Sequence, residues 1–170
     1  MMKRNAIKNI KAPIYILIGT LFSYVVLTLL AAAFGLSSGT VQFRISEALC
    51  ILPLFFPEAI PGLFIGCLIS NLLANGAPWD IVLGSLATLI GAFGTRLMVN
   101  IPEKLKWLAT IPTILSNMII IPFVLIYVYG LDDLYFVHMA WVGLGEVVCA
   151  GIGGSALYYL MKKHEKQWLM

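Results

Sequence analysis

The sequence predicts an all-α membrane protein, and its composition and hydropathy pattern lead to this fold class. Hydrophobic residues make up 61% of the 170 residues, charged residues only 11%, and the mean hydropathy is +0.95. An ordinary soluble domain is nearer half apolar and a quarter charged. A water-soluble globule of this size could not bury so much apolar surface, which excludes a soluble enzyme and a disordered protein. A net charge of +3 is also too small for a nucleic-acid binder.

Polar turn residues divide the chain into six apolar segments within a single domain, residues 1–170. The segments predict helices over about 12–34, 42–56, 59–74, 80–99, 107–129 and 136–161. Glycines at positions 35 and 130 mark two of the breaks. The second and third segments are short, because about 15 residues span only ~22 Å of a ~30 Å hydrocarbon core. Shortened helices of this kind often border a cavity.

The basic residues predict the orientation of this six-helix bundle. If the N-terminus is cytoplasmic, ten of the eleven Lys and Arg residues fall on the cytoplasmic side, as the positive-inside rule requires. These are Lys3, Arg4, Lys8, Lys11, Arg96, Lys104, Lys106, Lys162, Lys163 and Lys166. Both termini are then cytoplasmic, and the chain is a multi-pass protein of the cell membrane. Arg44 is the exception and needs a separate reason.

Several polar residues share the outer half of the predicted bundle, where ionisable groups are costly and usually mark a functional site. The candidate substrate-binding residues are Arg44, Glu47, Asn71, Asp80, Asn117 and Glu146. Structural alternatives stay open for most of them. Arg44 and Glu47 are three residues apart and could form an ion pair, Asp80 could be a helix N-cap, and the two asparagines could join helices.

Small residues form two faces that would let helices approach closely. Gly19 and Ser23 lie four residues apart on the first helix, and Ala150 and Gly154 repeat this spacing on the sixth. Both faces could pack within the bundle. The first could instead dock to another membrane protein.

Several absent motifs narrow the possible functions. The chain has no phosphate-binding G-x-x-x-x-G-K-[ST] loop, no H-E-x-x-H motif and no G-x-S-x-G elbow. Its three cysteines, Cys50, Cys67 and Cys149, include no C-x-x-C pair, which argues against a zinc site or a disulfide framework. We therefore expect no enzyme activity, no metal and no cofactor in this chain.

Three stretches of the sequence resemble the QueT family, the substrate-binding subunits of energy-coupling factor (ECF) transporters for queuosine precursors. The most specific is the run Val-Gln-Phe-Arg-Ile-Ser-Glu-Ala-Leu-Cys-Ile-Leu-Pro-Leu-Phe over residues 41–55. Gly-Ser-Leu-Ala-Thr-Leu at 84–89, after an Asp, and the Gly145-Glu146 step also fit. One departure is Gly19 and Ser23, where substrate-binding subunits of this class typically carry Ala-x-x-x-Ala for docking to the scaffold.

The resemblance implies a six-helix fold, an outward-facing ligand site, a membrane scaffold subunit and two ATPase subunits. The implied ligand is a 7-deazaguanine, expected to be the aminomethyl form or queuine. Its adjacent N1–H and amino group suit a carboxylate, supplied by Glu47, Asp80 or Glu146, while Arg44 or an asparagine amide could donate to its carbonyl. Two other classes stay open: a proton-coupled secondary transporter that uses Glu146 or Glu47, and an intramembrane enzyme.

Overall fold

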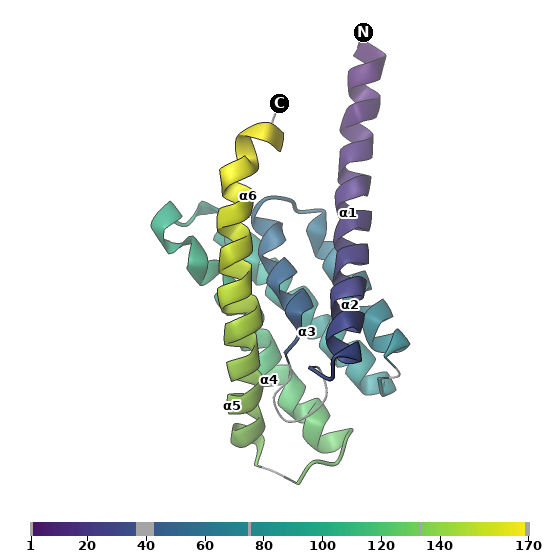
Figure 1. The fold of residues 1–170 in the computed structure, drawn as a ribbon, viewed down its shortest axis with the longest axis vertical. Coiled ribbons are helices and arrows are strands. Elements are labelled where there is room, and N and C mark those ends of the chain that lie inside the picture. Colours follow the sequence, from purple (N-terminus) through teal and green to yellow (C-terminus); the bar gives the residue numbers. More distant parts are fainter. Residues whose placement is uncertain (1, 37–42, 75, 133, 169–170) are drawn as a thin grey trace.

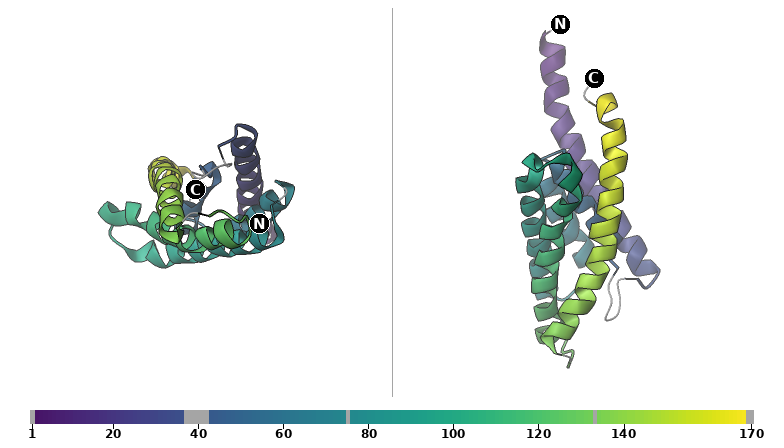
Figure 2. Two further views of the ribbon diagram at one scale, coloured as in Figure 1. Left: turned by 90° about the horizontal axis from the view of Figure 1, so that it is seen from below. Right: turned by 90° about the vertical axis from the view of Figure 1, so that its left-hand side faces the viewer.

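The helices of this chain follow one another around an arc, as the computed structural model shows in Figures 1 and 2. The structure describes residues 2–36, 43–74, 76–132 and 134–168, and side chains within 11–36, 43–74, 76–132 and 134–164. The α-helices are α1 (Met2–Ala33), α2 (Ala59–Leu73), α3 (Pro78–Leu97), α4 (Ile111–Tyr127), α5 (Tyr135–Glu146) and α6 (Gly154–Trp168). Three 3₁₀ segments are η1 (Ile45–Leu54), η2 (Met98–Asn100) and η3 (Glu103–Thr110), and η4 (Val147–Gly153) is a π-helix.

The predicted all-α fold with six apolar segments is confirmed, but several predicted boundaries are wrong. The first helix begins at Met2 rather than near residue 12, since the basic segment before it contains no helix breaker. The fourth begins at Pro78, because proline is well suited to the first helical position. The last continues from Tyr135 to Trp168 through the π-helix. Two predicted breaks are confirmed, because Gly35 and Gly130 have positive φ angles of 71° and 68°.

The largest correction concerns the second segment, predicted as an α-helix over 42–56. It is a 3₁₀ helix that covers only Ile45–Leu54, and residue 42 lies outside the described residues. Polar contacts hold it near both ends. The Thr28 hydroxyl donates to the Ser46 hydroxyl at 2.8 Å, and Arg96 donates to the Pro53 carbonyl at 3.0 Å.

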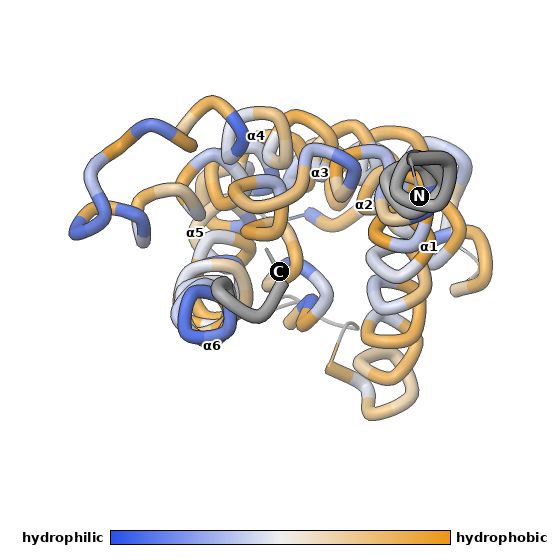
Figure 3. Tube along the Cα trace, turned by 90° about the horizontal axis from the view of Figure 1, so that it is seen from above, coloured by the Kyte–Doolittle hydropathy of each residue, from blue (hydrophilic) through white to orange (hydrophobic). Residues whose placement is uncertain are grey.

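This segment, η1, lies on the concave side of the arc, as its colour shows in the left view of Figure 2, and Figure 3 shows the same arc from above. Each α-helix from α1 to α4 packs against the next, whereas η1 contacts α1, α3, α6 and η4. Because η1 is surrounded in this way, its side chains point toward several elements at once. It therefore brings residues near position 45 into the interior of the bundle.

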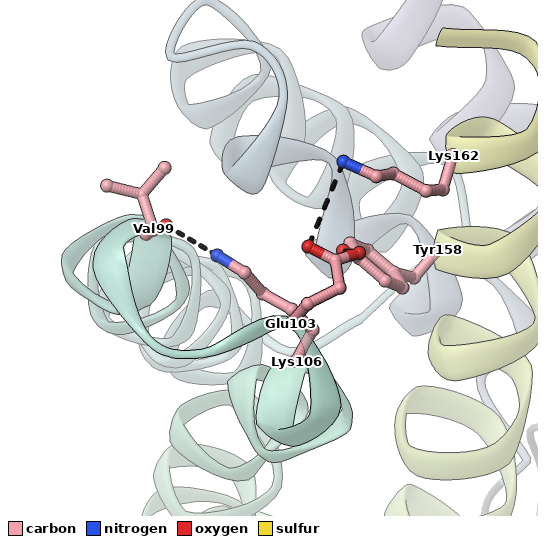
Figure 4. Close-up of polar contacts among 5 residues, drawn as sticks. All are labelled: Val99, Glu103, Lys106, Tyr158 and Lys162. Atoms are coloured by element: carbon pink, nitrogen blue, oxygen red, sulfur yellow. Dashed lines mark hydrogen bonds and ion pairs between the residues drawn. The ribbon is translucent and has the colours of Figure 1, made fainter.

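The chain begins and ends at the same end of the bundle (Figure 1). Segment η3 is tied to α6 at this end, because Tyr158 donates a hydrogen bond to Glu103 and Lys162 Nζ lies 3.8 Å from a Glu103 oxygen (Figure 4). Lys106 Nζ donates to the Val99 carbonyl near the end of α3, where a cation is favourable. The connection from α4 to α5 lies at the opposite end (Figure 1).

Four helical stretches in the described part of the chain are long and apolar enough to cross a membrane. They are Lys11–Ala33, Pro78–Asn100, Glu103–Tyr127 and Tyr135–His164, while η1 and α2 are apolar but shorter. Large apolar side chains are exposed along the outer faces of the bundle, for example Phe22, Ile90 and Ile119. A lipid environment would cover such surfaces.

Candidate functional site

Glu47 on η1 lies at the centre of a buried polar network. It is 1% exposed, and its carboxylate accepts hydrogen bonds from the Tyr24 hydroxyl, from Cys50 Sγ at 3.1 Å and, at a long 3.4 Å, from the Thr88 hydroxyl. These donors come from α1, η1 and α3, so the carboxylate joins three elements. Buried charges are tolerated when they are hydrogen-bonded in this way.

Arg44 immediately precedes η1, whereas the sequence placed it in the first turns of a helix. Within the described residues it forms no ion pair with Glu47, so the predicted alternative of a direct Arg44–Glu47 pair is wrong. The guanidinium still interacts electrostatically with both Asp80 and Glu47. No hydrogen bond from it to another described residue is present, so its donors are available to a ligand.

Asp80 is the third residue of α3 and is not its N-cap, a position that Ala77 occupies. The Tyr129 hydroxyl donates to Asp80 Oδ2 at 2.8 Å and accepts from the Ala77 backbone N–H at 3.3 Å. Partial burial raises the pKa of Tyr129 above its usual value near 10, with the Asp80 hydrogen bond adding to the shift. The phenol therefore stays protonated and holds Asp80 at neutral pH.

Asn71, near the end of α2, lies beside Asp80 and Arg44. The three side chains meet around Gly84, where a Cβ atom would be 3.0 Å from Asn71 Nδ2 and 3.7 Å from both Arg44 Nη1 and Asp80 Oδ1. Asn71 Nδ2 also donates weakly to Cys67 Sγ at 3.6 Å. The arrangement places two groups of donors next to a carboxylate.

Glu146 and Asn117 form a second part of the site, in which two oxygens lack partners. Glu146 is 4% exposed at the end of α5, and Asn117 on α4 is 1% exposed. Asn117 Nδ2 donates to Glu146 Oε1 at 2.9 Å, but Glu146 Oε2 and Asn117 Oδ1 have no hydrogen-bond partner among the described residues. We call these two atoms the acceptor pair. Buried unpartnered acceptors are rare and need an explanation, such as a bound ligand.

The structure brings all six predicted site residues together. Glu146 interacts electrostatically with both Glu47 and Arg44, which connects the acceptor pair to the cluster around Asp80. The site can therefore accept hydrogen bonds at one end and donate them at the other. Such a combination suits a polar heterocycle with adjacent N–H groups and a carbonyl oxygen.

Sequence reasoning missed several residues that position the site. Tyr24, Thr88 and Tyr129 are uncharged and lie in apolar segments, where only their hydroxyls could have drawn attention. The three cysteines are free and buried, and two of them are also hydrogen-bonded. Cys50 donates to Glu47, and Cys67 accepts from Thr88 at 3.4 Å.

The two predicted small-residue faces differ in their surroundings. Gly19 and Ser23 are exposed on α1, and a Cβ at Gly19 would have no atom within 4 Å. On the other face Ala150 is buried, and a Cβ at Gly154 would lie 3.3 Å from Thr110 and 3.4 Å from the Ala48 carbonyl. Only the second face packs within the bundle.

Comparisons with known proteins identify one family of transporters. The family model described as QueT transporter matches residues 16–163. A curated relative from Lactococcus lactis subsp. cremoris (strain MG1363), "Queuosine precursor transporter QueT", is 36% identical over 86 residues. These residues make up 49% of this chain and 50% of the relative, so the chain spans about half the length of the curated relative that it matches. No solved structure matches the chain.

The family model covers most of the chain, including every candidate site residue and all four long apolar stretches except the start of the first and the end of the last. This multi-pass protein of the cell membrane therefore belongs to the QueT transporter family.

Proposed function

We propose that this chain is the substrate-binding membrane subunit of an ATP-driven ECF importer and captures a queuosine precursor from outside the cell. The acceptor pair is the observation that carries the proposal. A 7-deazaguanine ring offers N1–H and an exocyclic amino group side by side, and these donors would pair with Glu146 Oε2 and Asn117 Oδ1. The ring carbonyl would accept from Arg44 or Asn71.

The charges of the site favour a ligand that carries a positive charge. Three carboxyl groups, those of Glu47, Asp80 and Glu146, lie in the same buried region as one guanidinium, that of Arg44. An alkylammonium at the 7-position would offset part of this excess, whereas a nitrile would not. We therefore propose the aminomethyl base or queuine as the ligand.

Direct binding to the purified protein in detergent tests this function. We expect 7-aminomethyl-7-deazaguanine and queuine to bind more tightly than 7-cyano-7-deazaguanine, because only the first two carry a basic alkylamine at the 7-position. Adenine should bind least, since its N1 is an acceptor, whereas the acceptor pair requires a donor on the ligand at this position. Equal weak binding of all four compounds would contradict the proposed function.

The proposed energy source lies outside this chain, in a membrane scaffold subunit and two ATPase subunits. Purified protein alone in liposomes should bind the ligand without concentrating it, and addition of the scaffold, the ATPases and ATP should start uptake. A secondary transporter that carries protons on the buried Glu146 would instead concentrate the ligand alone, driven by a proton gradient. Release of a chemically altered product would indicate an enzyme.

The orientation is proposed from the basic residues, with both termini in the cytoplasm. Lys104 is exposed near the end that bears the termini, and Asp132 is exposed in the connection at the opposite end. We expect Lys104→Cys to react with impermeant thiol reagents only after the cells are opened, and Asp132→Cys to react in intact cells. The native cysteines are buried, so they add little background. The reverse labelling pattern would mean that both termini are outside and that the site faces the cytoplasm.

A further inference from the structure

Gly84 on α3 lies where three candidate site residues converge. The three atoms nearest to a Cβ built on it are Asn71 Nδ2, Arg44 Nη1 and Asp80 Oδ1, at 3.0, 3.7 and 3.7 Å. All three are polar ends of side chains, and they come from α2, from the residue before η1 and from α3 itself. The bare Cα of Gly84 is therefore part of the wall of the site.

Helix packing explains the other glycines of α3 but not this one. A Cβ at Gly91 would lie 2.7 Å from Thr113 Cα, and one at Gly94 would lie 2.4 Å from Pro112 Cβ, so both allow α3 and α4 to approach closely. The atoms around Gly84 belong to side-chain ends that can move. Because glycine inside a helix is less favourable than alanine, its presence here calls for another reason.

We propose that Gly84 is a positioning residue for the ligand site, acting through the amide of Asn71. This inference rests on the proposed function. The missing side chain lets the Asn71 amide lie against α3, close to Arg44 and Asp80. Its Nδ2 atom has only the weak contact with Cys67 Sγ at 3.6 Å among the described residues, so it can still donate to a ligand. The amide and the Arg44 guanidinium together form a donor set for the carbonyl oxygen of a heteroaromatic ring.

A methyl group at position 84 would move this donor set without disrupting the packing of the helices. At 3.0 Å the Cβ is too close to Asn71 Nδ2 for ordinary contact, so the amide would shift by a few tenths of an ångström. A shift of this size approaches the limit of about 0.5 Å within which the groups of a binding site must be held. Folding tolerates such a shift at the end of a side chain.

The test compares Gly84→Ala, Asn71→Ala and the double variant, with 7-aminomethyl-7-deazaguanine as the probe and purified protein in detergent. We expect Gly84→Ala to raise Kd about ten-fold. Its thermal midpoint without ligand should equal or exceed that of the wild type, because alanine is the better helix former. The double variant should bind no more weakly than Asn71→Ala alone, since no amide is left to displace.

Gly151→Ala is the matched control, because a Cβ there makes an ordinary contact of 3.6 Å with Ile114 Cδ1. It should bind like the wild type. Three results would each overturn the role of Gly84. They are wild-type affinity in Gly84→Ala, a lower thermal midpoint of this variant without ligand, and a double variant whose increase in Kd is the product of the two single increases. If the wild type itself does not bind the probe, the proposed function fails first and this inference with it.

Discussion

Replacement of Glu146 by glutamine is expected to lower ligand affinity about ten- to more than a hundred-fold while the protein stays folded. Hydrogen bonds to a charged group contribute roughly 1.5–3 kcal/mol, which corresponds to this range of affinity. The variant keeps the shape of the side chain. Its amide oxygen can still accept from Asn117 Nδ2, as Glu146 Oε1 does at 2.9 Å. The amide NH₂ then replaces Oε2 and meets the donors of the ligand.

Two measurements on Glu146→Gln distinguish a role in ligand binding from a role in folding: the affinity for the ligand and the thermal stability without it. A neutral amide is cheaper to bury than a carboxylate, so stability should change little or rise. Glu103→Gln is a suitable control, because Glu103 contacts Tyr158 and Lys162 at the end of the bundle that bears the termini. Unchanged affinity would show that Glu146 does not bind the ligand. A poorly folded variant with normal affinity would instead make Glu146 a structural residue.

Gly19→Leu is expected to abolish assembly with the proposed scaffold subunit, while ligand binding by the isolated chain is unchanged. Gly19 and Ser23 are exposed on α1, and no atom of this chain lies within 4 Å of a Cβ at Gly19. A leucine is therefore accommodated by the chain alone. It would keep a partner helix from the close approach that small residues permit. Co-purification of the tagged variant with scaffold and ATPases measures the loss.

Gly62→Leu provides the contrast, because the same change is made where α1 and α2 already touch. A Cβ at Gly62 would lie 2.7 Å from the Leu17 carbonyl oxygen, and one at Gly66 would lie 3.0 Å from Tyr24 Cβ. We expect Gly62→Leu to lower the yield and thermal midpoint of the isolated chain. Wild-type assembly of Gly19→Leu would show that the exposed face of α1 does not dock to the scaffold.

The polar residues of the site could be predicted from sequence because they are conspicuous in apolar helices. Arg44 was the only basic residue against the orientation rule, and Glu146 had no basic neighbour on its helix. The turn glycines at 35 and 130 could be predicted equally well, since both have the positive φ angle that favours glycine. These features depend on residue type and position alone.

Other parts of the site depend on tertiary contacts that no local pattern encodes. Tyr129 holds Asp80 across 49 positions of sequence, and Tyr24 reaches Glu47 across 23. The 3₁₀ form of η1 could not be predicted from the sequence either, because its composition resembles that of any short apolar helix. Runs of 3₁₀ helix longer than three or four residues are uncommon. The ten residues of η1 depend on the helices around them.

The 3₁₀ geometry of η1 also restricts how its length can change in evolution. With three residues per turn, side chains three apart are eclipsed, so Glu47, Cys50 and Pro53 follow one another in a straight column. One inserted or deleted residue would turn everything beyond it by about 120°. A surface loop tolerates insertions, but the register of this segment is as strict as that of a strand in a sheet.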